Sequence, residues 1–476
     1  MIPSNGALHN ASAVEIRDML RARKISCSEL VEDFRRRHEA VDPLLNAMPT
    51  TCFDEAMERA RAIDILRNKG SYTETVLGGV PVGIKDLAAV AGIRSTWGTR
   101  ALSEFVPALN DPIVDRLIDS GAIVVGKTNT PEMGAGNVTF NDVFGATRNP
   151  WNITRNPGGS SGGSCAAVSA CMLPLAHGTD LAGSLRNPAS YCGVTTLRPT
   201  PGRAGGPPQS VLFNTETVHG PIARSVADVA LMLDAMVGFD PRIPISIEAP
   251  DFSFLERVFA GPERTYRVGL SLDLDGFAKA ESGIADLIDK AVTSLSSRFL
   301  DVRSASPKIP HLYDTYSVLR SMLWASGPGS QPPNVQQHYK STLQRNISKA
   351  HALQADDIYR ALTNRTKLYN SMLEFFRTYD CLLCPVIGKQ PGPIEEEYPR
   401  EIAGETIDDY VDWLRFSFLA PAASLPAAVI PIGLDQEGMP VGIQLIGKPR
   451  GEAELLVIAS VFEREFCFDH KPQLPI

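Results

Sequence analysis

The segment from Asn156 to Pro188 constrains the fold of this chain more than any other, because it contains two clusters of glycine and serine. The first cluster reads PGGSSGGS over residues 157–164, and the second reads GTDLAGSLRNP over residues 178–188. Glycines beside a serine let the backbone approach a ligand closely and adopt φ values that other residues resist. The backbone N–H groups of such turns are the donors that an oxyanion hole requires. The segment therefore indicates a site built around a serine.

A serine is a poor nucleophile unless a base lies within hydrogen-bond reach. Histidine is the usual base, and the candidates are His177, just before the second cluster, and His219 in the sequence VHGPIAR. A lone histidine beside a glycine turn is more often structural, so both histidines are weak candidates.

Lysine is the alternative base. Lys85 lies in the sequence GIKD within an otherwise apolar strand region, so its side chain is expected to point into the protein. Complete burial disfavours the ammonium form and lowers a lysine pKa by roughly 3 to 5 pH units. A neutral lysine can accept a proton from serine at physiological pH. The other interpretation is an ion pair with a nearby carboxylate such as Asp86, which is the favoured one when the segment is taken alone.

Together these segments resemble the amidase-signature family, whose sequence blocks they follow in order. The strand with Lys85 and the loops with Ser160 and Ser184 come first, followed by CGV…LRPT (192–200), GPIARS (220–225) and PVGIQL (440–445). The 24-residue interval between Ser160 and Ser184 is also that of the family. One glycine-rich run would be weak evidence, whereas an ordered set of blocks is specific. The resemblance is strong over residues 10–240 and moderate over 380–465.

The resemblance implies a Ser–Ser–Lys triad. In it, Ser184 attacks an amide carbonyl, and Ser160, which follows a cis peptide bond, passes the proton between Ser184 and Lys85. Ser161 is implied to support these groups, and Asp180 is implied to pair with Arg186 and brace the nucleophile loop. Water then hydrolyses the acyl-enzyme, and no cofactor or metal is implied. The groups implied to bind the scissile amide and its oxyanion are the backbone at Gly134 and the N–H groups of Leu181, Ala182, Gly183 and Ser184.

Ala182 departs from the family pattern, which usually has glycine at this position. Alanine keeps the N–H group but disfavours positive φ. We therefore expect an ordinary φ at Ala182 and a pocket narrowed by its methyl group.

Hydrophobic periodicity predicts two helices between residues 12 and 37 and a third over 54–67. Ser12 and Ser28 are the predicted N-caps, with Glu15 as the capping-box partner of Ser12. Strand and helix signals then alternate to about residue 240, which is typical of an α/β domain. The pattern is mainly helical over 241–378, and strand signals return over 382–386, 427–432 and 440–446.

We therefore predict one α/β domain over residues 1–476, with N-terminal helices over 8–70 and a helical insertion over 241–378 that covers the site. The resemblance adds a three-layer α/β/α fold with a large mixed central sheet. Two local patterns are set aside. Gly121 to Thr128 matches the P-loop pattern, but a helical stretch precedes it and a strand fills it. Cys381 and Cys384 have C-x-x-C spacing, but strand alternation would place their thiols on opposite faces.

The charge and the cysteine content exclude other classes of protein. The net charge is −8, which favours neither nucleic acid nor an anionic membrane surface. No apolar run reaches the ~18 to 20 residues that span a bilayer. Residues 1–6 do not begin a secretory signal. Eight scattered cysteines do not form a disulfide framework. We expect a cytoplasmic protein, and the resemblance leaves a homodimer open.

The predicted activity is hydrolysis of a carboxylic amide, with esters and carbamates open to the same chemistry. An aryl or hydrophobic amide or anilide is suggested by apolar side chains in or near the insertion: Tyr313, Tyr316, Met322, Leu323, Trp324, Phe416 and Phe418.

Two alternatives to this activity stay open. One is the glutaminase subunit of a tRNA-dependent amidotransferase, although segments 129–136 and 185–188 look more like free-standing bacterial amidases. The other is a non-catalytic binding protein, which is disfavoured because Lys85, Ser160 and Ser184 are all present.

Overall fold

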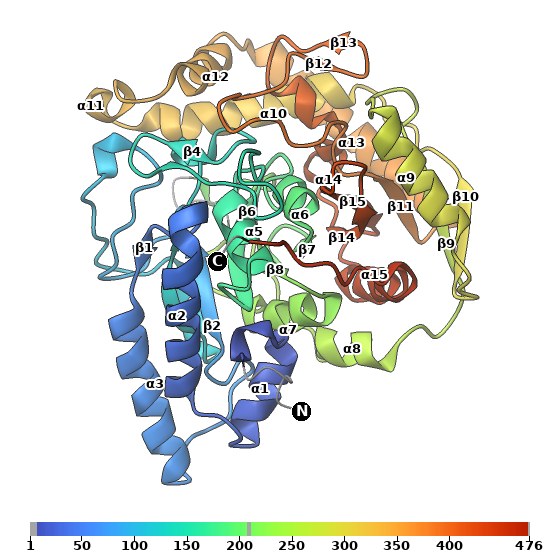
Figure 1. Ribbon diagram of the computed structural model, residues 1–476. Coiled ribbons are helices and arrows are strands. Elements are labelled where there is room, and N and C mark those ends of the chain that lie inside the picture. Colours follow the sequence, from blue (N-terminus) through green and yellow to red (C-terminus); the bar gives the residue numbers. More distant parts are fainter. Residues whose placement is uncertain (1–6, 207–210, 475–476) are drawn as a thin grey trace.

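The computed structural model describes residues 7–206 and 211–474, and its central element is an 11-stranded mixed sheet (Figure 1). The strand order is β1-β3-β2-β6-β8-β7-β14-β15-β11-β9-β10. Helices cover both faces of this sheet, so the predicted α/β class is confirmed. The strands of the sheet are β1 (Thr50–Thr51), β2 (Pro81–Lys85), β3 (Ile123–Thr128), β6 (Leu175–Asp180), β7 (Thr195–Arg198), β8 (Val218–Ala223), β9 (Tyr266–Leu270), β10 (Leu300–Ser304), β11 (Cys381–Pro385), β14 (Ala427–Leu434) and β15 (Pro440–Gly447).

Two short hairpins and the helices complete the described part of the chain. The hairpins pair β4 (Phe140–Asn141) with β5 (Gly145–Ala146), and β12 (Glu401–Ile402) with β13 (Glu405–Thr406). The α-helices are α1 (Ala13–Arg21), α2 (Cys27–Leu45), α3 (Phe53–Asn68), α4 (Pro112–Asp119), α5 (Gly162–Ser169), α6 (Arg186–Cys192), α7 (Val226–Met236), α8 (Phe254–Ala260), α9 (Ser282–Thr293), α10 (Leu312–Ser326), α11 (Pro333–Gln336), α12 (Ser341–His351), α13 (Ala355–Thr378), α14 (Leu419–Ala422) and α15 (Glu452–Phe466). The 3-10 helices are η1 (Leu8–Asn10), η2 (Arg100–Leu102), η3 (Glu132–Gly134), η5 (Pro328–Ser330) and η6 (Asp412–Ser417).

The three N-terminal helices form as predicted, with one N-cap placed differently. Ser12 caps α1 in a capping box with Glu15, as the sequence indicates. The predicted cap at Ser28 is wrong, because Ser26 caps α2 in a box with Glu29. The Ser28 hydroxyl is instead bonded to Asp64 of α3, at 2.7 Å. This contact ties α2 to α3.

The relative direction of three strands brings polar side chains to one edge of the sheet. Strand β2 runs parallel to both β3 and β6, with Val82 opposite Leu175 of β6 and Lys85 opposite Thr128 of β3. The carboxyl ends of parallel neighbours meet at the same edge, where α/β sheets commonly bind ligands. Lys85 and Asp180, the last residues of β2 and β6, therefore lie at that edge.

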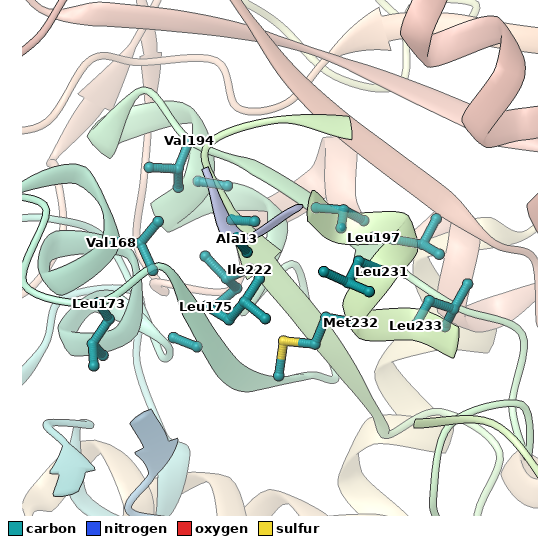
Figure 2. Close-up of a cluster of buried hydrophobic side chains, with 14 of the residues drawn as sticks. Ala13, Val168, Leu173, Leu175, Val194, Leu197, Ile222, Leu231, Met232 and Leu233 are labelled. Atoms are coloured by element: carbon teal, nitrogen blue, oxygen red, sulfur yellow. The ribbon is translucent and has the colours of Figure 1, made fainter. Parts of the chain in front are cut away.

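Two large hydrophobic cores pack against the sheet. The first core joins β2, β6 and β8 to α1, α2, α3, α5, α7 and α15. Figure 2 shows part of it, with Leu175 of β6 and Ile222 of β8 among side chains of α5 and α7. The second core joins β11 and β15 to α10, α13 and α14. Cys381 belongs to the first core and Cys384 to the second, so the C-x-x-C thiols lie on opposite faces as expected.

Residues 241–378 contain helices α8 to α13 and also two strands that the sequence pattern does not predict. Strand β9 pairs in parallel with β11 and with the edge strand β10. Charged residues alternate with apolar ones in LDVRS, the sequence of β10, and its exposed Arg303 and Ser304 are typical of an edge position. In Figure 1, α10, α11 and α12 lie at the opposite end of the view from α2 and α3.

The P-loop pattern is a chance match, as its sequence context indicates. Helix α4 precedes Gly121, and the residues between the two glycines of the pattern lead directly into β3. Within the described ranges, no helix combines the length and apolar character that a membrane crossing requires. Residues 1–6, on which the expected lack of a secretory signal rests, lie outside the described residues.

The close packing of α5 predicts a stability difference between two glycines that occupy the same position in their helices. A Cβ on Gly163 would lie 2.4 Å from the backbone nitrogen of Asn129 and 2.6 Å from the Ala47 carbonyl oxygen. Gly163→Ala should therefore lower the free energy of unfolding by about 1–3 kcal/mol. Gly283 of α9 is the control, because a Cβ there meets nothing within 4 Å.

Gly283→Ala should be neutral or stabilising by up to about 1 kcal/mol, since alanine is the better helix former. Urea unfolding of both variants measures the difference. Equal stability of the two variants would contradict the tight packing of α5 against the end of β3.

Candidate active site

Lys85 lies at the centre of a buried polar cluster at the carboxyl ends of β2 and β6. Its side chain has no exposed surface, and its Nζ lies 2.7 Å from Ser160 Oγ, 2.9 Å from Ser161 Oγ and 2.9 Å from Thr179 Oγ1. All three partners are neutral hydroxyl groups. Burial lowers the pKa of the Lys85 ammonium from its usual 10.5 to about 7, and the more distant charge of Asp180 opposes this shift. A substantial neutral fraction therefore exists at physiological pH.

The ion pair between Lys85 and Asp86, which the local sequence favours, is not formed. Asp86 accepts instead from Lys127 Nζ at 2.9 Å and from the Thr96 hydroxyl at 2.7 Å. Lys127 also donates to the Ala88 carbonyl and the Ser95 hydroxyl. The pair does not form because Asp86 directly follows Lys85 and faces the opposite way, toward Lys127 of the neighbouring strand β3.

Ser160 and Ser161 lie directly before α5, and the peptide bond between Gly159 and Ser160 is cis. The Ser161 N–H donates to the Ser184 carbonyl at 3.0 Å. Its hydroxyl also donates to the Thr179 carbonyl at 3.2 Å. These bonds hold the two serine-containing loops side by side, with Lys85 beneath the first of them. The structure thus brings Lys85 and Ser160 into hydrogen-bond contact and holds the backbone of Ser184 beside Ser161.

The turn that carries Ser184 is wrapped around the carboxylate of Asp180. This carboxylate accepts from the N–H groups of Gly183 and Leu185, each at 3.1 Å. It also pairs with Arg186 at 2.9 Å and with Arg198 at 3.1 Å, and all three side chains are fully buried. The expected pairing of Asp180 with Arg186 is therefore confirmed.

The electrostatics of this ion cluster fix the charge of Asp180. Burial alone would raise the pKa of the carboxyl group, but the charges of Arg186 and Arg198 hold it well below its usual value. Hydrogen bonds from Arg186 and from the Gly183 N–H act in the same direction. Asp180 is thus ionised throughout the physiological range, and its charge is neutralised locally.

The N–H groups expected to bind an oxyanion differ in availability. The Gly183 N–H is already engaged by Asp180, because Gly183 adopts a φ of 91° that turns its N–H toward the carboxylate. Within residues 7–206 and 211–474, no acceptor is bonded to the N–H of Leu181, Ala182 or Ser184. Ala182 does not have a positive φ, as its side chain requires.

Gly134 lies against the serine loop, where the resemblance places it. Its N–H donates to the Pro131 carbonyl at 2.8 Å. A Cβ at this position would lie 2.7 Å from Leu87 Cδ1 and 3.5 Å from Ser160 Oγ. A side chain would therefore clash with Leu87 and touch Ser160 at an ordinary contact distance, and the φ of 73° also favours glycine.

His177 and His219 bond to each other and to neither serine of the expected triad. Their Nε2 and Nδ1 atoms are 2.7 Å apart, and both rings are buried. Burial lowers the pKa of His219 to about 4, and it also lowers the pKa of His177, helped by the nearby positive groups. Both rings are therefore neutral at physiological pH, and this geometry favours a structural role.

Sequence reasoning missed three contributors to the site. Thr179 lies within the quoted GTD segment, and Arg198 within LRPT, so a signal for both was present but carried no assigned role. Ser417 of η6 carries no such signal; its carbonyl accepts from Arg186 at 3.0 Å, and its hydroxyl bonds to Asn187. These contacts connect the turn that carries Ser184 to a segment more than 200 residues away in the sequence.

A side chain of the expected insertion bonds directly to the turn that carries Ser184. The Tyr316 hydroxyl donates to the Leu181 carbonyl at 3.0 Å, and its ring lies 4.3 Å from that of Phe418. Trp324 packs in a small apolar cluster with Leu181, beside the loop that carries Gly134. Of the candidate pocket residues, Tyr313 and Met322 are exposed, whereas the others are buried: Tyr316, Leu323, Trp324, Phe416 and Phe418.

The chain is similar to known proteins in both sequence and structure. The family model described as Amidase matches residues 29–456. The chain belongs to the amidase-signature family. The crystal structure of a bacterial aryl acylamidase of this family aligns with a TM-score of 0.88 and 29% identity, covering 96% of each chain. The fold of this amidase, with its 11-stranded mixed sheet, is that of the family.

Curated relatives of this amidase include two kinds of protein. An acylamidase from Rhodococcus erythropolis is 33% identical, and the match covers 96% of this chain and 95% of that protein. A glutamyl-tRNA(Gln) amidotransferase subunit from Caldanaerobacter subterraneus subsp. tengcongensis is 31% identical, and the match covers 98% of each. The chain is thus an amidohydrolase that acts on C–N bonds. The similar identities of 33% and 31% do not distinguish between an acylamidase and an amidotransferase subunit.

The ion cluster around Asp180 predicts a large loss of stability on its removal. Asp180→Asn leaves two buried guanidinium groups without their carboxylate, so the free energy of unfolding at pH 7 should fall by roughly 3–5 kcal/mol. The pKa of Asp180 is lower in the folded protein than in the unfolded chain, where it is near 4. The ionised carboxylate therefore stabilises the folded state above about pH 4, and this stabilisation is lost as the pH falls through the pKa of the folded state. The difference between wild type and variant should therefore shrink below about pH 4.

The matched control is Asp301→Asn, which breaks the exposed pair with Arg303 and should change stability little. Urea unfolding at pH 7 and pH 3.5 makes the comparison. Similar effects of the two substitutions at pH 7 would contradict the assigned role of Asp180.

Proposed function

We propose that this amidase is a self-sufficient serine amidohydrolase in which Ser184 is the nucleophile, Ser160 the proton relay and Lys85 the base. The observation that carries the proposal is the buried Lys85 Nζ, 2.7 Å from Ser160 Oγ and with a pKa lowered to about 7 by burial. A lysine in this state matches the requirement for a general base near neutral pH. Its position on a rigid strand supports precise proton transfer.

In the first half-reaction, Ser184 Oγ attacks the amide carbonyl. Its proton passes to Ser160 Oγ while Ser160 gives its own proton to the neutral Lys85 Nζ. The tetrahedral intermediate then collapses: the C–N bond breaks, and the proton returns from Lys85 through Ser160 to the leaving nitrogen. An amine leaves, and the acyl group stays on Ser184 as an ester.

In the second half-reaction, water takes the place of the amine. The neutral Lys85 accepts a proton from water through Ser160, and the hydroxide oxygen attacks the acyl carbon. Collapse of the second tetrahedral intermediate releases the carboxylic acid, and the proton returns from Lys85 through Ser160 to Ser184 Oγ. The net reaction consumes one water and yields a carboxylic acid and an amine.

The negative oxygen of both intermediates is assigned to the N–H groups of Leu181, Ala182 and Ser184. These donors have no acceptor among the described residues, whereas the Gly183 N–H serves Asp180. One such donor is typically worth about 3–4 kcal/mol of barrier. The Gly134 carbonyl is proposed to accept from the N–H of the scissile amide.

The proposed substrate is an aryl or hydrophobic amide or anilide, with esters and carbamates open to the same residues. The buried aromatic side chains beside Leu181 support this class, as does the likeness to acylamidases. The second candidate is the glutaminase subunit of an amidotransferase, which the 31% identical relative favours. A cytoplasmic location and a homodimer remain predictions from the sequence.

Turnover by the purified chain alone tests the proposal. Amine or ammonia release would be measured on anilides, short aliphatic amides and glutamine, with Ser184→Ala as the blank. Lys85→Ala should lower kcat/KM by at least about 100-fold, because it removes the base. His219→Ala is the matched control, since the His219 ring bonds to His177 and to neither serine of the proposed triad, and it should keep most of the activity.

Activity on anilides that disappears in the Ser184→Ala blank would support the proposal. The reverse ranking of Lys85→Ala and His219→Ala would overturn the assignment of the base. Activity confined to glutamine and dependent on an added partner would support the glutaminase candidate instead.

A further inference from the structure

Helix α10 places a buried arginine over the region next to the nucleophile turn. Arg320 is 5% exposed, and its guanidinium lies 5.1 Å from the Trp324 ring and 5.3 Å from the Tyr410 ring. One Nη donates to Asn346 Oδ1 at 3.0 Å, and the other donates to the Tyr410 hydroxyl. Every direct hydrogen-bond partner of this cation in the described residues is neutral.

Several donors in the cluster of Arg320, Trp324 and Tyr410 have no acceptor among the described residues. Among the residues described, neither Arg320 Nε nor Trp324 Nε1 has a hydrogen-bond partner, although both are buried. The Tyr410 oxygen already accepts from Arg320 and, at 3.2 Å, from Asn346 Nδ2. Its own proton has no acceptor in the described ranges. Buried donors are normally satisfied, so this concentration of unmatched donors points to an acceptor from outside the chain.

The carboxylates nearest to the cluster are engaged elsewhere. Asp409 pairs with Lys349, and Glu397 accepts from Lys340 and the Thr342 hydroxyl. Within the described parts of the chain, no carboxylate lies within ion-pair distance of Arg320. A buried guanidinium that lacks a counter-ion is costly, and a carboxylate ligand would both neutralise it and satisfy its donors.

The cluster also lies on the face of α10 that contacts the site. Tyr316, Arg320 and Trp324 are four residues apart, so they share one face, and each step advances about 6 Å along the axis. Tyr316 bonds to the Leu181 carbonyl, and Trp324 belongs to the apolar cluster against which Leu181 packs. Arg320 thus lies on α10 between Tyr316, which bonds to the residue carrying a proposed oxyanion donor, and Trp324, which shares an apolar cluster with that residue.

We infer that Arg320, with Trp324 and Tyr410, binds a carboxylate that the substrate carries away from its scissile amide. This inference rests on the proposed function and narrows its substrate class to amides that bear a remote anionic group. The cluster offers no free carboxylate for an ammonium group. The preferred substrate therefore has a carboxylate without an adjacent amino group, which disfavours glutamine.

Matched substrate pairs test the inference on the wild-type enzyme. Glutaranilate against butyranilide places the carboxylate at the acyl end, and 4-acetamidobenzoate against acetanilide places it at the amine end. At least one pair should show a preference in kcat/KM for the carboxylate on the order of 10- to 100-fold. Glutaramate should also be a better substrate than glutamine.

Variants then assign the preference to Arg320. In Arg320→Met the preference should collapse toward one, and in Arg320→Lys part of it should remain, because the charge is kept. Arg345→Met removes an exposed positive charge from the neighbouring helix α12 and should leave the preference unchanged. Thermal unfolding of each variant checks that it is folded, and the wild-type comparison stands even where a variant is not.

The outcomes separate this inference from the proposed function. Hydrolysis of the neutral amides with no carboxylate preference, or better turnover of glutamine than of glutaramate, would overturn the inference and leave the proposed function intact. An equal loss of preference in Arg320→Met and Arg345→Met would also overturn it. Failure of the wild type to hydrolyse any of these amides above the Ser184→Ala blank would overturn both.

Discussion

The site depends on the complete burial of one lysine at the carboxyl end of a strand. Lys85 is held between hydroxyl groups, and no carboxylate of the described residues pairs with it, so burial lowers its pKa to about 7. This situation requires the neighbouring strand β6 to run parallel to β2, because only then does Thr179 lie at the same edge. It also requires the two serine loops to close over the same spot, which the bond from the Ser161 N–H to the Ser184 carbonyl secures. The proton affinity of Lys85 thus depends on the direction of the strands and on the contact between the two serine loops.

The buried charges around the site are kept apart from Lys85. Asp86 is neutralised by Lys127, and Asp180 by two arginines, so neither carboxylate forms an ion pair with the proposed base. A direct partner would favour the ammonium form and raise the lysine pKa, which would remove the base at neutral pH. The same Asp180 carboxylate shapes the Ser184 turn through two backbone N–H groups. One ion cluster therefore both orders the proposed nucleophile and protects the proton affinity of the base.

The local sequence predicted which segments form this site better than it predicted which side chains contact one another there. The serine clusters, the lysine strand and the N-terminal helices follow from spacing and composition, and the order of the blocks indicated the family. The pairing of Lys85 with Asp86 was wrong because a neighbour in sequence faces away on a strand, while Lys127 arrives from the parallel strand β3. The β9 and β10 strands escaped detection because each is only five residues long and contains charge, a pattern that resembles an amphipathic helix segment. The contacts of Ser417 and of Arg320 join distant segments, and no local pattern encodes them.

The pH dependence of serine modification tests the neutral state of Lys85 most directly. A sulfonyl fluoride would be added to the wild-type enzyme in a single-turnover experiment, and the rate of Ser184 modification would be measured from pH 5 to pH 10. If Lys85 with its pKa of about 7 is the base, the rate should rise about tenfold per pH unit below pH 7 and reach a plateau above it. A rate independent of pH, or one that keeps rising to pH 10 without a plateau, would contradict a neutral lysine base.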